Sequence, residues 1–558
     1  MRGRDVLRRT ILGQWRLAAG GAVLAAGHQS GEALVPVLIG VVIDEAISTA
    51  DAGALARWIA VLAAVFAGLS FSFRFSFRLA ERAAERSAHE LRLELTRRTL
   101  DPRGGAEAGR LPGELVNIAT GDAKRVGAVH AALAAGAAAL AGLVAGGVAL
   151  LSISVPLGLL VLLGIPPLLG LAHVLGKPLE RRSGAEQERA AHASGVAADL
   201  IAGLRVLKGI GAEGAAVDRY RRTSRDSLAA TVRAARAQAW HDGGMLILTG
   251  VFLAIVALVG GRLAVAGDIT VGQLVTAVGL AQFLLGPLSI LSWANGEFAQ
   301  GRASAARAAS ALGAPPAVAE GDASPPRPVR GEVRLRDVSH GDALRGLSLE
   351  VAPGELMGVV TTDPAAATSL LRLLGRAADP ESGAVELDGV ALSALDPAGI
   401  RRAVVVAEHD ADLFEGTLLE NVTAAAGGGE AEPALAAAAA DEVARNLPRG
   451  TATVLTERGR SLSGGQRQRV ALARALAADA PVLVLHDPTT AVDAVTEARI
   501  AAGVRELRAG RTTIVVTTSP ALLAAADRVA LVDGGAVVAE GFHAELVHEY
   551  PAYRATVL

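Results

Sequence analysis

The segment Thr361–Ser369 lies where a phosphate-binding loop would be expected. It follows an apolar run, Leu356–Val360, that predicts a buried strand, and it leads into a predicted helix, Thr368–Leu374. The phosphate-loop pattern GxxxxGK(S/T) occupies such a strand-to-helix junction, where backbone N–H groups surround phosphate and the hydroxyl binds Mg²⁺. The hydroxyl pair Thr368 and Ser369 is present, so both are candidate nucleotide contacts and Thr368 is a candidate Mg²⁺ ligand, should nucleotide bind.

The rest of the phosphate-binding chemistry is missing from this segment. It contains no glycine, whose freedom at positive φ lets the backbone curl around phosphate. Pro364 lacks an N–H donor, and Asp363 places a negative charge where phosphate would lie. Ala367 stands at the lysine position, and no lysine follows Lys208 in the chain. Taken alone, the segment favours a plain strand-to-helix turn over a nucleotide site.

A second motif points to a family. Residues 460–469 read RSLSGGQRQR and lie one helix ahead of an apolar strand. This run resembles the LSGGQ signature of ABC transporters, and nearly the whole chain resembles a half-transporter of the six-helix exporter type. In that family two nucleotide domains meet head to tail, and each ATP lies between one domain's phosphate loop and the other's signature. The resemblance therefore implies that four residues contact an ATP held by a partner: Ser463, Gly464, Gly465 and Gln466.

Several other family positions carry unusual residues. His486 and Asp487 follow strand Pro481–Leu485, where the family has an Asp that holds Mg²⁺ and a Glu that positions water. Histidine is a poor Mg²⁺ ligand, because this ion prefers hard oxygen donors. Asp487 keeps a carboxylate that is one methylene shorter, so it would polarise water only weakly. A purely structural pair at the end of a strand remains the alternative for both residues.

The remaining family positions fall into two groups, altered and intact. His409 lies where the family has the Q-loop glutamine, and Thr518 takes the place of the switch histidine. An adenine-stacking aromatic residue is missing around His340–Leu344. By contrast, Asp493 matches the D-loop aspartate. Elements that would handle this chain's own ATP are altered, whereas those offered to a partner are intact.

The resemblance thus implies a heterodimeric exporter that uses ATP and Mg²⁺. A second half-transporter with intact phosphate-loop and catalytic motifs would complete one hydrolytic site. This chain would be an ATP-driven translocase only within that complex, with little or no ATPase activity alone. Two alternatives remain open: a siderophore importer built on the same framework, and a catalytically silent scaffold or regulatory subunit.

These motifs require an α/β domain to position them. Short apolar strands alternate with helices from residue 331 onward, which is typical of an α/β fold. We expect a degenerate nucleotide-binding domain over residues 331–558, after a linker at 312–330 that is rich in Ala, Pro and Gly. The predicted strands outside Leu356–Val360 are Glu332–Val338 and Ser348–Val351 at sheet edges, and Ala403–Val406, Pro481–Leu485, Thr512–Val516 and Arg528–Val532 in the interior.

Residues 1–311 predict an all-α membrane domain. A membrane helix needs about 20 mostly apolar residues. Six such segments occur: Leu17–Ile43, Trp58–Phe73, two within Val126–Gly176, Gly243–Gly261 and Ile269–Asn295. Breaks at Asp101–Gly113 and Gly209–Gly214 interrupt long basic connections, and they suggest short transverse helices at the cytoplasmic side.

Charge and composition limit the remaining possibilities. Arginines gather before the first span and after the second and fourth, so both termini and the nucleotide-binding domain are expected on the cytoplasmic side of the membrane. The abundance of Ala, Gly and Arg is typical of a GC-rich bacterial genome, which would make this the bacterial inner membrane. A net charge of -2 argues against a nucleic-acid partner, and the absence of cysteine excludes thiol chemistry. The expected partners are the lipid bilayer and a small or amphiphilic, lipid-like substrate, because the polar residues within the spans are few.

Overall fold

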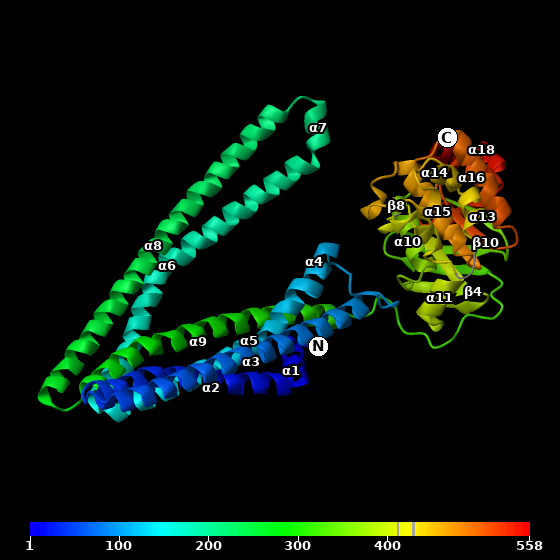
Figure 1. The fold of residues 1–558 in the computed structure, drawn as a ribbon. Coiled ribbons are helices and arrows are strands. Elements are labelled where there is room, and N and C mark those ends of the chain that lie inside the picture. Colours follow the sequence, from blue (N-terminus) through cyan, green and yellow to red (C-terminus); the bar gives the residue numbers. More distant parts are fainter. Residues whose placement is uncertain (410–411, 427–429) are drawn as a thin grey trace. The chain divides into compact units, whose positions relative to one another are not determined.

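The computed structural model describes residues 1–558 except 410–411 and 427–429. Its contacts divide the chain into two units (Figure 1). The first comprises Met1–Leu95 and Val116–Ser310, and the second comprises Thr96–Leu115 and Ala311–Leu558. The predicted boundary between a membrane domain and a linker, after residue 311, remains a prediction. The second unit also contains Thr96–Leu115, which includes the first predicted break, Asp101–Gly113.

The first unit is helical, and α3, α4 and α9 extend from it into the second. The helices up to residue 312 are α1 (Gly3–Gly13), α2 (Trp15–Val42), η1 (Ile43–Ile47), α3 (Ala52–Thr99), α4 (Pro112–Asn117), η2 (Ile118–Asp122), α5 (Ala123–Ile153), α6 (Val155–Ala202), α7 (Leu204–Gly209), α8 (Glu213–Ala266) and α9 (Val271–Leu312). Short helices α4 and α7 occur next to the two predicted breaks. An apolar core that includes Leu150, Leu157, Val256 and Leu284 joins α5, α6, α8 and α9.

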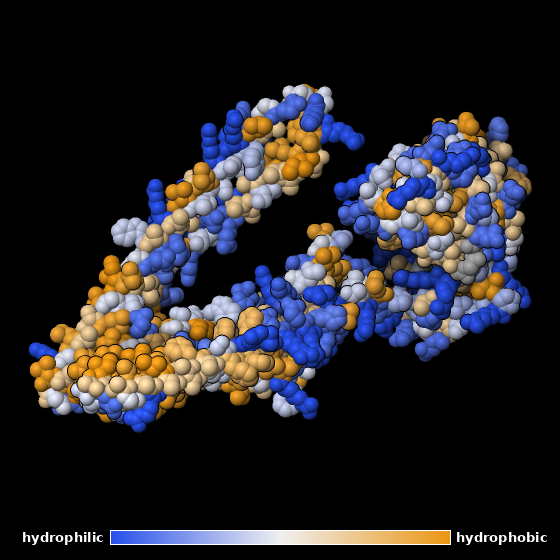
Figure 2. Space-filling model, viewed as in Figure 1, coloured by the Kyte–Doolittle hydropathy of each residue, from blue (hydrophilic) through white to orange (hydrophobic). Residues whose placement is uncertain are grey.

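Within the described residues, five helical stretches are long and apolar enough to cross a membrane: Ala52–Thr99, Pro112–Ile153, Val155–Ala202, Glu213–Ala266 and Val271–Leu312. They contain five of the six predicted spans. The first predicted span is also a helix, α2, whose 28 residues would extend about 42 Å. Its hydropathy is lowered by His28, Gln29 and Glu32, which lie within two turns of one another. Figure 2 shows apolar side chains gathered over long stretches of this unit's surface, as expected for lipid-facing helices.

The second unit contains two main sheets. One is a four-stranded antiparallel sheet in the order β2-β1-β4-β5, and the other is a six-stranded sheet in the order β12-β11-β3-β10-β9-β6. The strands are β1 (Val333–His340), β2 (Leu344–Val351), β3 (Leu356–Thr361), β4 (Ser382–Leu387), β5 (Val390–Ala391), β6 (Val404–Ala407), β7 (Gly416–Thr417), β8 (Val454–Leu455), β9 (Val482–His486), β10 (Thr512–Val516), β11 (Arg528–Asp533) and β12 (Ala536–Gly541). In the larger sheet only β12 runs antiparallel to its neighbour.

Helices and short turns complete this unit. They are α10 (Pro364–Leu374), η3 (Leu392–Ala394), α11 (Pro397–Ala403), α12 (Leu418–Thr423), α13 (Ala431–Ala437), α14 (Ala440–Arg445), η4 (Gly450–Ala452), η5 (Glu457–Gly459), α15 (Gly464–Ala477), α16 (Ala494–Leu507), α17 (Pro520–Ala525), α18 (His543–Glu549) and α19 (Pro551–Val557). The combination of a helical unit, with helices of membrane-spanning length, and an α/β unit agrees with the predicted fold class.

Two details of the sheet prediction are wrong. Strand β1 was expected at an edge, but it lies between β2 and β4 because its backbone groups pair on both sides. Strand β6 was expected to be buried, but it forms the edge of the larger sheet beside β9 and only its first residue, Val404, is buried. Its side chains are still partly covered, which explains its apolar sequence.

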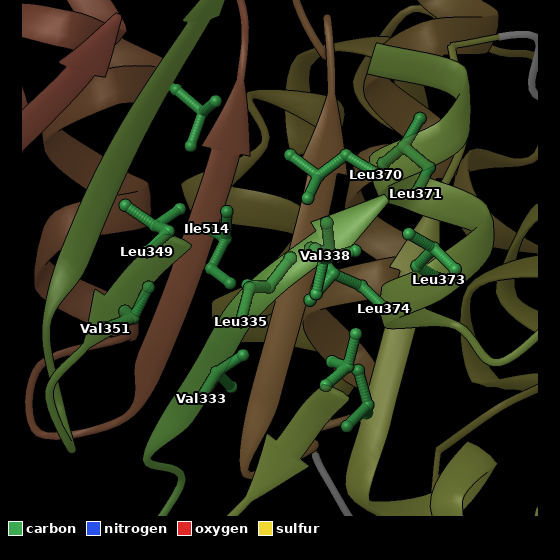
Figure 3. Close-up of a cluster of buried hydrophobic side chains, with 14 of the residues drawn as sticks. Val333, Leu335, Val338, Leu349, Val351, Leu370, Leu371, Leu373, Leu374 and Ile514 are labelled. Carbon is green, nitrogen blue, oxygen red and sulfur yellow. The ribbon is translucent and has the colours of Figure 1, made fainter. Parts of the chain in front are cut away.

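A single apolar core holds α10 against both sheets. Leu370, Leu371 and Leu374 of α10 pack with Leu335 of β1 and Ile514 of β10 (Figure 3). These α10 positions recur at i, i+1 and i+4, so they lie on one helix face. This packing fixes the orientation of α10. It therefore also fixes which groups the N-terminus of α10 presents at the end of β3.

The predicted linker is attached to the rest of the second unit at specific points. The buried Arg376 donates from Nη2 to the carbonyl oxygens of Ala319, at 2.8 Å, and Ser393, at 3.0 Å. The N–H of Ala317 donates to the Arg103 carbonyl at 3.0 Å. Gly105 has φ +90°, and a Cβ there would lie 2.1 Å from the Pro315 oxygen. The first break is therefore folded against the linker.

Candidate functional site

The parallel strands bring the predicted site elements to one edge of the larger sheet. Val516 of β10 pairs with Val359 of β3 on one side and with His486 of β9 on the other. The segments that follow these three strands therefore emerge side by side. Ligands of open α/β sheets bind at this edge, beyond the carboxyl ends of the strands.

The N-terminus of α10 is closed by the chain's own carboxylate. The helix begins at Pro364, four residues before the predicted start, because Asp363 is its N-cap and proline suits the first helical position. Asp363 Oδ1 accepts the N–H of Ala365 at 2.9 Å, and its carbonyl accepts the N–H of Ala366 at 3.1 Å. Pro364 has no N–H, so this terminus offers no spare donor in its first turn. A phosphate would meet the Asp363 carboxylate instead of an open cradle.

The side chains after this cap are also committed. Ala367, at the lysine position, is 4% exposed and belongs to the core beneath the sheets. The Thr368 hydroxyl donates to the Pro364 carbonyl at 3.1 Å, within the helix. Ser369 is partly buried on the next position. The nucleotide and Mg²⁺ roles of Thr368 and Ser369 remain predictions, and neither residue sits in a glycine-rich loop.

The N-terminus of α15 has the opposite character. Ser463 is its N-cap and forms a capping box with Gln466: the Ser463 N–H donates to Gln466 Oε1 at 2.9 Å, and the Gln466 N–H donates to Ser463 Oγ at 3.4 Å. Gly464 and Gly465 occupy the first two helical positions, whose N–H groups have no intrahelical acceptor. Ser463 and Gly464 are exposed, and the cap is uncharged. This terminus can bind an anion with N–H groups and the helix dipole.

The glycine at position 465 is required by packing. A Cβ there would lie 2.4 Å from the Ala491 carbonyl oxygen, so the signature and the D-loop touch through their backbones. A residue that sequence reasoning missed, Gln468, joins the same segments. Its Nε2 donates to the Asp487 carbonyl at 2.9 Å and its Oε1 accepts the N–H of Ala491 at 2.9 Å. The sequence does contain a signal for this role, because Gln468 is the one polar residue on a helix face that is otherwise Val, Ala and Leu.

His486 and Asp487 lie together at the end of β9. His486 Nε2 is 3.8 Å from Asp487 Oδ2, and about a quarter of each side chain is exposed. Asp487 has φ +44°, a left-handed conformation that Asp tolerates, and its N–H donates to the Val516 carbonyl at 2.9 Å. The other carboxylate oxygen is buried without a hydrogen-bond partner in the described part of the chain. The catalytic roles of both residues remain predictions.

His409 lies near these residues. Its ring faces that of His486 edge-on, with centroids 6.1 Å apart, and its Nδ1 is 3.4 Å from Thr490 Oγ1. Two neighbouring cavities, of about 560 and 440 Å³, contain His409 and Gln468 in their walls. Gly464 lines the first and His486 the second. No described lining residue of either cavity comes from 361–369.

Asp493 and Thr518 lie at the starts of two helices, α16 and α17. Asp493 is the N-cap of α16, and its Oδ1 accepts the N–H of Thr496 at 3.0 Å. That N–H bond stabilises the carboxylate and holds the pKa of Asp493 below its ordinary value. Thr518 is exposed beside Ser519, the N-cap of α17.

Two family models match the chain. The ABC transporter transmembrane region matches residues 19–288, and the ABC transporter model matches residues 344–490. An ATP-dependent lipid A-core flippase of Thiobacillus denitrificans is 30% identical over 393 residues, which cover 69% of this chain and 68% of the flippase. A multidrug efflux ATP-binding/permease protein of Mycobacterium tuberculosis is 35% identical over 424 residues, or 73% of this chain.

Length and fold add to this comparison. The matched residues cover only 35% of the mycobacterial protein, so this chain spans about a third of that relative. A solved structure of a bacterial Atm1-family ABC exporter with ATP bound has a TM-score of 0.73 with this chain. The match covers 99% of this chain and 98% of the other at 22% identity, so it shows a shared fold.

Proposed function

Because this chain belongs to the ABC transporters and has the fold of an exporter half with a membrane domain fused to a nucleotide-binding domain, we propose that it works as one half of a heterodimer. The second half would supply an intact phosphate loop and a catalytic glutamate. ATP would be hydrolysed at a composite site that this chain completes with its signature, Ser463–Gln466. Hydrolysis there would drive movement of the membrane helices.

The contrast between two helix N-termini carries this proposal. At α10 an acidic cap and a proline leave no open donor in the first turn, whereas at α15 a neutral serine cap precedes two glycines whose N–H groups have no acceptor among the described residues. Both termini have the same dipole, so the difference lies in the residues at the cap. Within one domain, the terminus that would hold this chain's own phosphate is closed and the one presented to a partner is open.

The residues of the signature fit the phosphate groups of ATP, while the Mg²⁺ ligands would have to come from the partner. When bound, MgATP supplies the phosphoryl group and the metal that neutralises its charge. The N–H groups of Gly464 and Gly465 would bind a terminal phosphate, and the Ser463 hydroxyl would lie beside it. Gln468 would hold the D-loop against α15, so that Asp493 keeps its position relative to the signature.

The chain's own side does not fit the nucleotide. Asp363 repels phosphate, Ala367 is buried, and His486 replaces the oxygen ligand that Mg²⁺ prefers. We therefore assign no hydrolytic step to Thr368, Ser369, His409, His486 or Asp487. Their retained polar groups would hold the edge of the sheet in shape.

The relatives support the direction and the setting. One is named for multidrug efflux and another for lipid A-core flipping, and both names favour export of an amphiphilic or lipid-like substrate over import. Bacterial relatives and apolar helices of membrane-spanning length favour the inner membrane, with the nucleotide-binding domain in the cytoplasm.

ATPase assays of the purified chain, alone and with its partner, test the proposal. Affinity capture from native membranes would supply the partner half-transporter. We expect the chain alone to show no ATPase activity above a detergent blank, and the two-chain complex to hydrolyse ATP. Brisk hydrolysis by the isolated chain would contradict the proposal, and a two-chain complex without activity would favour the silent scaffold.

A further inference from the structure

The helical unit contains a cavity of about 490 Å³ that the nucleotide chemistry does not use. Helices α2, α3, α5 and α9 line it. Its wall on α5 consists of alanines, among them Ala131, Ala134 and Ala138, which leave a smooth apolar surface. Its walls on α3 and α9 carry aromatic and acidic side chains. One side of the cavity is therefore apolar, and the other is aromatic and negatively charged.

Two helices each contribute an aromatic side chain and a glutamate, four residues apart, to this cavity. On α3, Phe77 is followed four residues later by Glu81, and on α9, Trp293 is followed four residues later by Glu297. Residues at i and i+4 share a helix face, so each aromatic ring and its carboxylate adjoin the same space. Phe77 is 57% exposed and Trp293 is 51% exposed, which leaves ring surface available to a ligand.

The negative charge of this cavity is not compensated within it. Neither Glu81 nor Glu297 has an ion pair or hydrogen bond in the described part of the chain, and no lysine or arginine is among the described lining residues. Carboxylates beside aromatic faces attract organic cations through charge and through the ring quadrupole. An anionic ligand of the same size would be repelled.

His28 adds an acceptor on the α2 side of the cavity. Its Nδ1 is 3.0 Å from the Leu69 carbonyl, which can only accept, so Nδ1 carries the proton. In the neutral ring Nε2 is then a lone-pair acceptor. The ring also packs against Phe73, with centroids 5.3 Å apart, which holds it at the cavity wall.

We propose that this cavity binds an amphiphilic organic cation. The apolar body would rest against the α5 alanines, and the charge would lie between the aromatic rings and the two carboxylates. Glu297 lies two residues beyond the predicted span Ile269–Asn295, and Glu81 lies eight residues beyond the predicted span Trp58–Phe73, about 12 Å further along α3. Both carboxylates therefore lie past the apolar ends of their spans, which suits a molecule whose charged end extends out of the apolar layer. The inference rests on the proposed function, because it names the substrate class of that transporter.

Equilibrium dialysis of the full chain in phosphatidylcholine nanodiscs tests this inference without nucleotide or partner. The probes are radiolabelled tetraphenylphosphonium and tetraphenylborate, which have nearly the same shape and opposite charge. We expect saturable binding of the phosphonium above empty nanodiscs and none of the borate. Glu81→Gln and Glu297→Gln should each weaken phosphonium binding roughly tenfold, whereas Glu85→Gln, on α3 but outside the cavity, should leave it unchanged.

Equal binding of the two probes, or unchanged phosphonium affinity in both cavity variants, would overturn the inference. The comparison of probes uses the unaltered chain, so it decides the matter even where a variant fails to fold. The assay needs no ATP. A negative result would therefore leave the composite ATP site standing, while an inactive two-chain complex with intact phosphonium binding would refute only the proposed hydrolytic role.

Discussion

Changing Ser463 to aspartate is expected to lower the ATPase rate of the two-chain complex by roughly a hundredfold or more, with little effect on folding. Aspartate is as good an N-cap as serine, so α15 should keep its first turn. The new carboxylate would give α15 the same acidic cap that closes α10, and it would face the terminal phosphate of the partner's ATP. Two like charges about 4 Å apart repel by about 4 kcal/mol at a protein surface, which corresponds to roughly a thousandfold, and solvent screening reduces it toward about a hundredfold.

A matched control separates charge from capping. Ser519 is the N-cap of α17, and its Oγ accepts the Leu522 N–H at 3.3 Å, much as Ser463 accepts the Gln466 N–H. Ser519→Asp adds the same charge on this chain's own, closed side. The complex should therefore retain its activity. If both variants hydrolyse ATP like the unaltered complex, the signature of this chain is not part of the active site.

Restoring the missing lysine is expected to destabilise the chain and not to recover nucleotide binding. Ala367 is 4% exposed and packed in the core, so Ala367→Lys would force a charged side chain into apolar surroundings or push α10 off the sheets. We expect a loss of about 3 kcal/mol or more in the free energy of unfolding. Ala365→Lys, two residues earlier on an exposed position, should change it by less than about 0.5 kcal/mol.

Thermal unfolding of the full-length variants in nanodiscs measures this difference. Binding of a fluorescent ATP analogue to the same samples reports on the site. An Ala367→Lys chain that unfolds at the unaltered temperature and binds the analogue would show that the cradle was lacking only its cation. The capping geometry of Asp363 predicts the opposite result.

The sequence predicted the signature and most strands because these features are local. Thr512–Val516 matches β10 at both ends, and the buried strand Leu356–Val360 lies within β3. Apolar runs with turn residues on either side need no knowledge of the fold to be recognised. The LSGGQ run is recognisable from its resemblance to a family motif, and the structure places it at a helix start with Ser463 and Gln466 in a capping box.

The early start of α10 was missed for an identifiable reason. Asp363 and Pro364 depart from the phosphate-loop pattern, but an Asp followed by Pro is also a strong helix-start signal. Comparison with a family pattern hid the local chemistry.

The other omissions depend on tertiary contacts. Sheet order follows from pairing between distant segments, so the inner position of β1 was not visible in its sequence. The same holds for Gly105, whose backbone approaches Pro315, and for Gln468, whose partners lie about twenty residues further along the chain.

Photolabelling of the active two-chain complex with 2-azido-ATP, followed by peptide mapping, tests the central claim most directly. A closed α10 terminus predicts that the covalent label is found on the adenine-binding side of the partner and that this chain's peptides covering His340–Leu344 and Thr361–Ser369 remain unlabelled. Label in either of those peptides, removed by excess unlabelled ATP, would show that nucleotide occupies this chain's own site and would contradict the account.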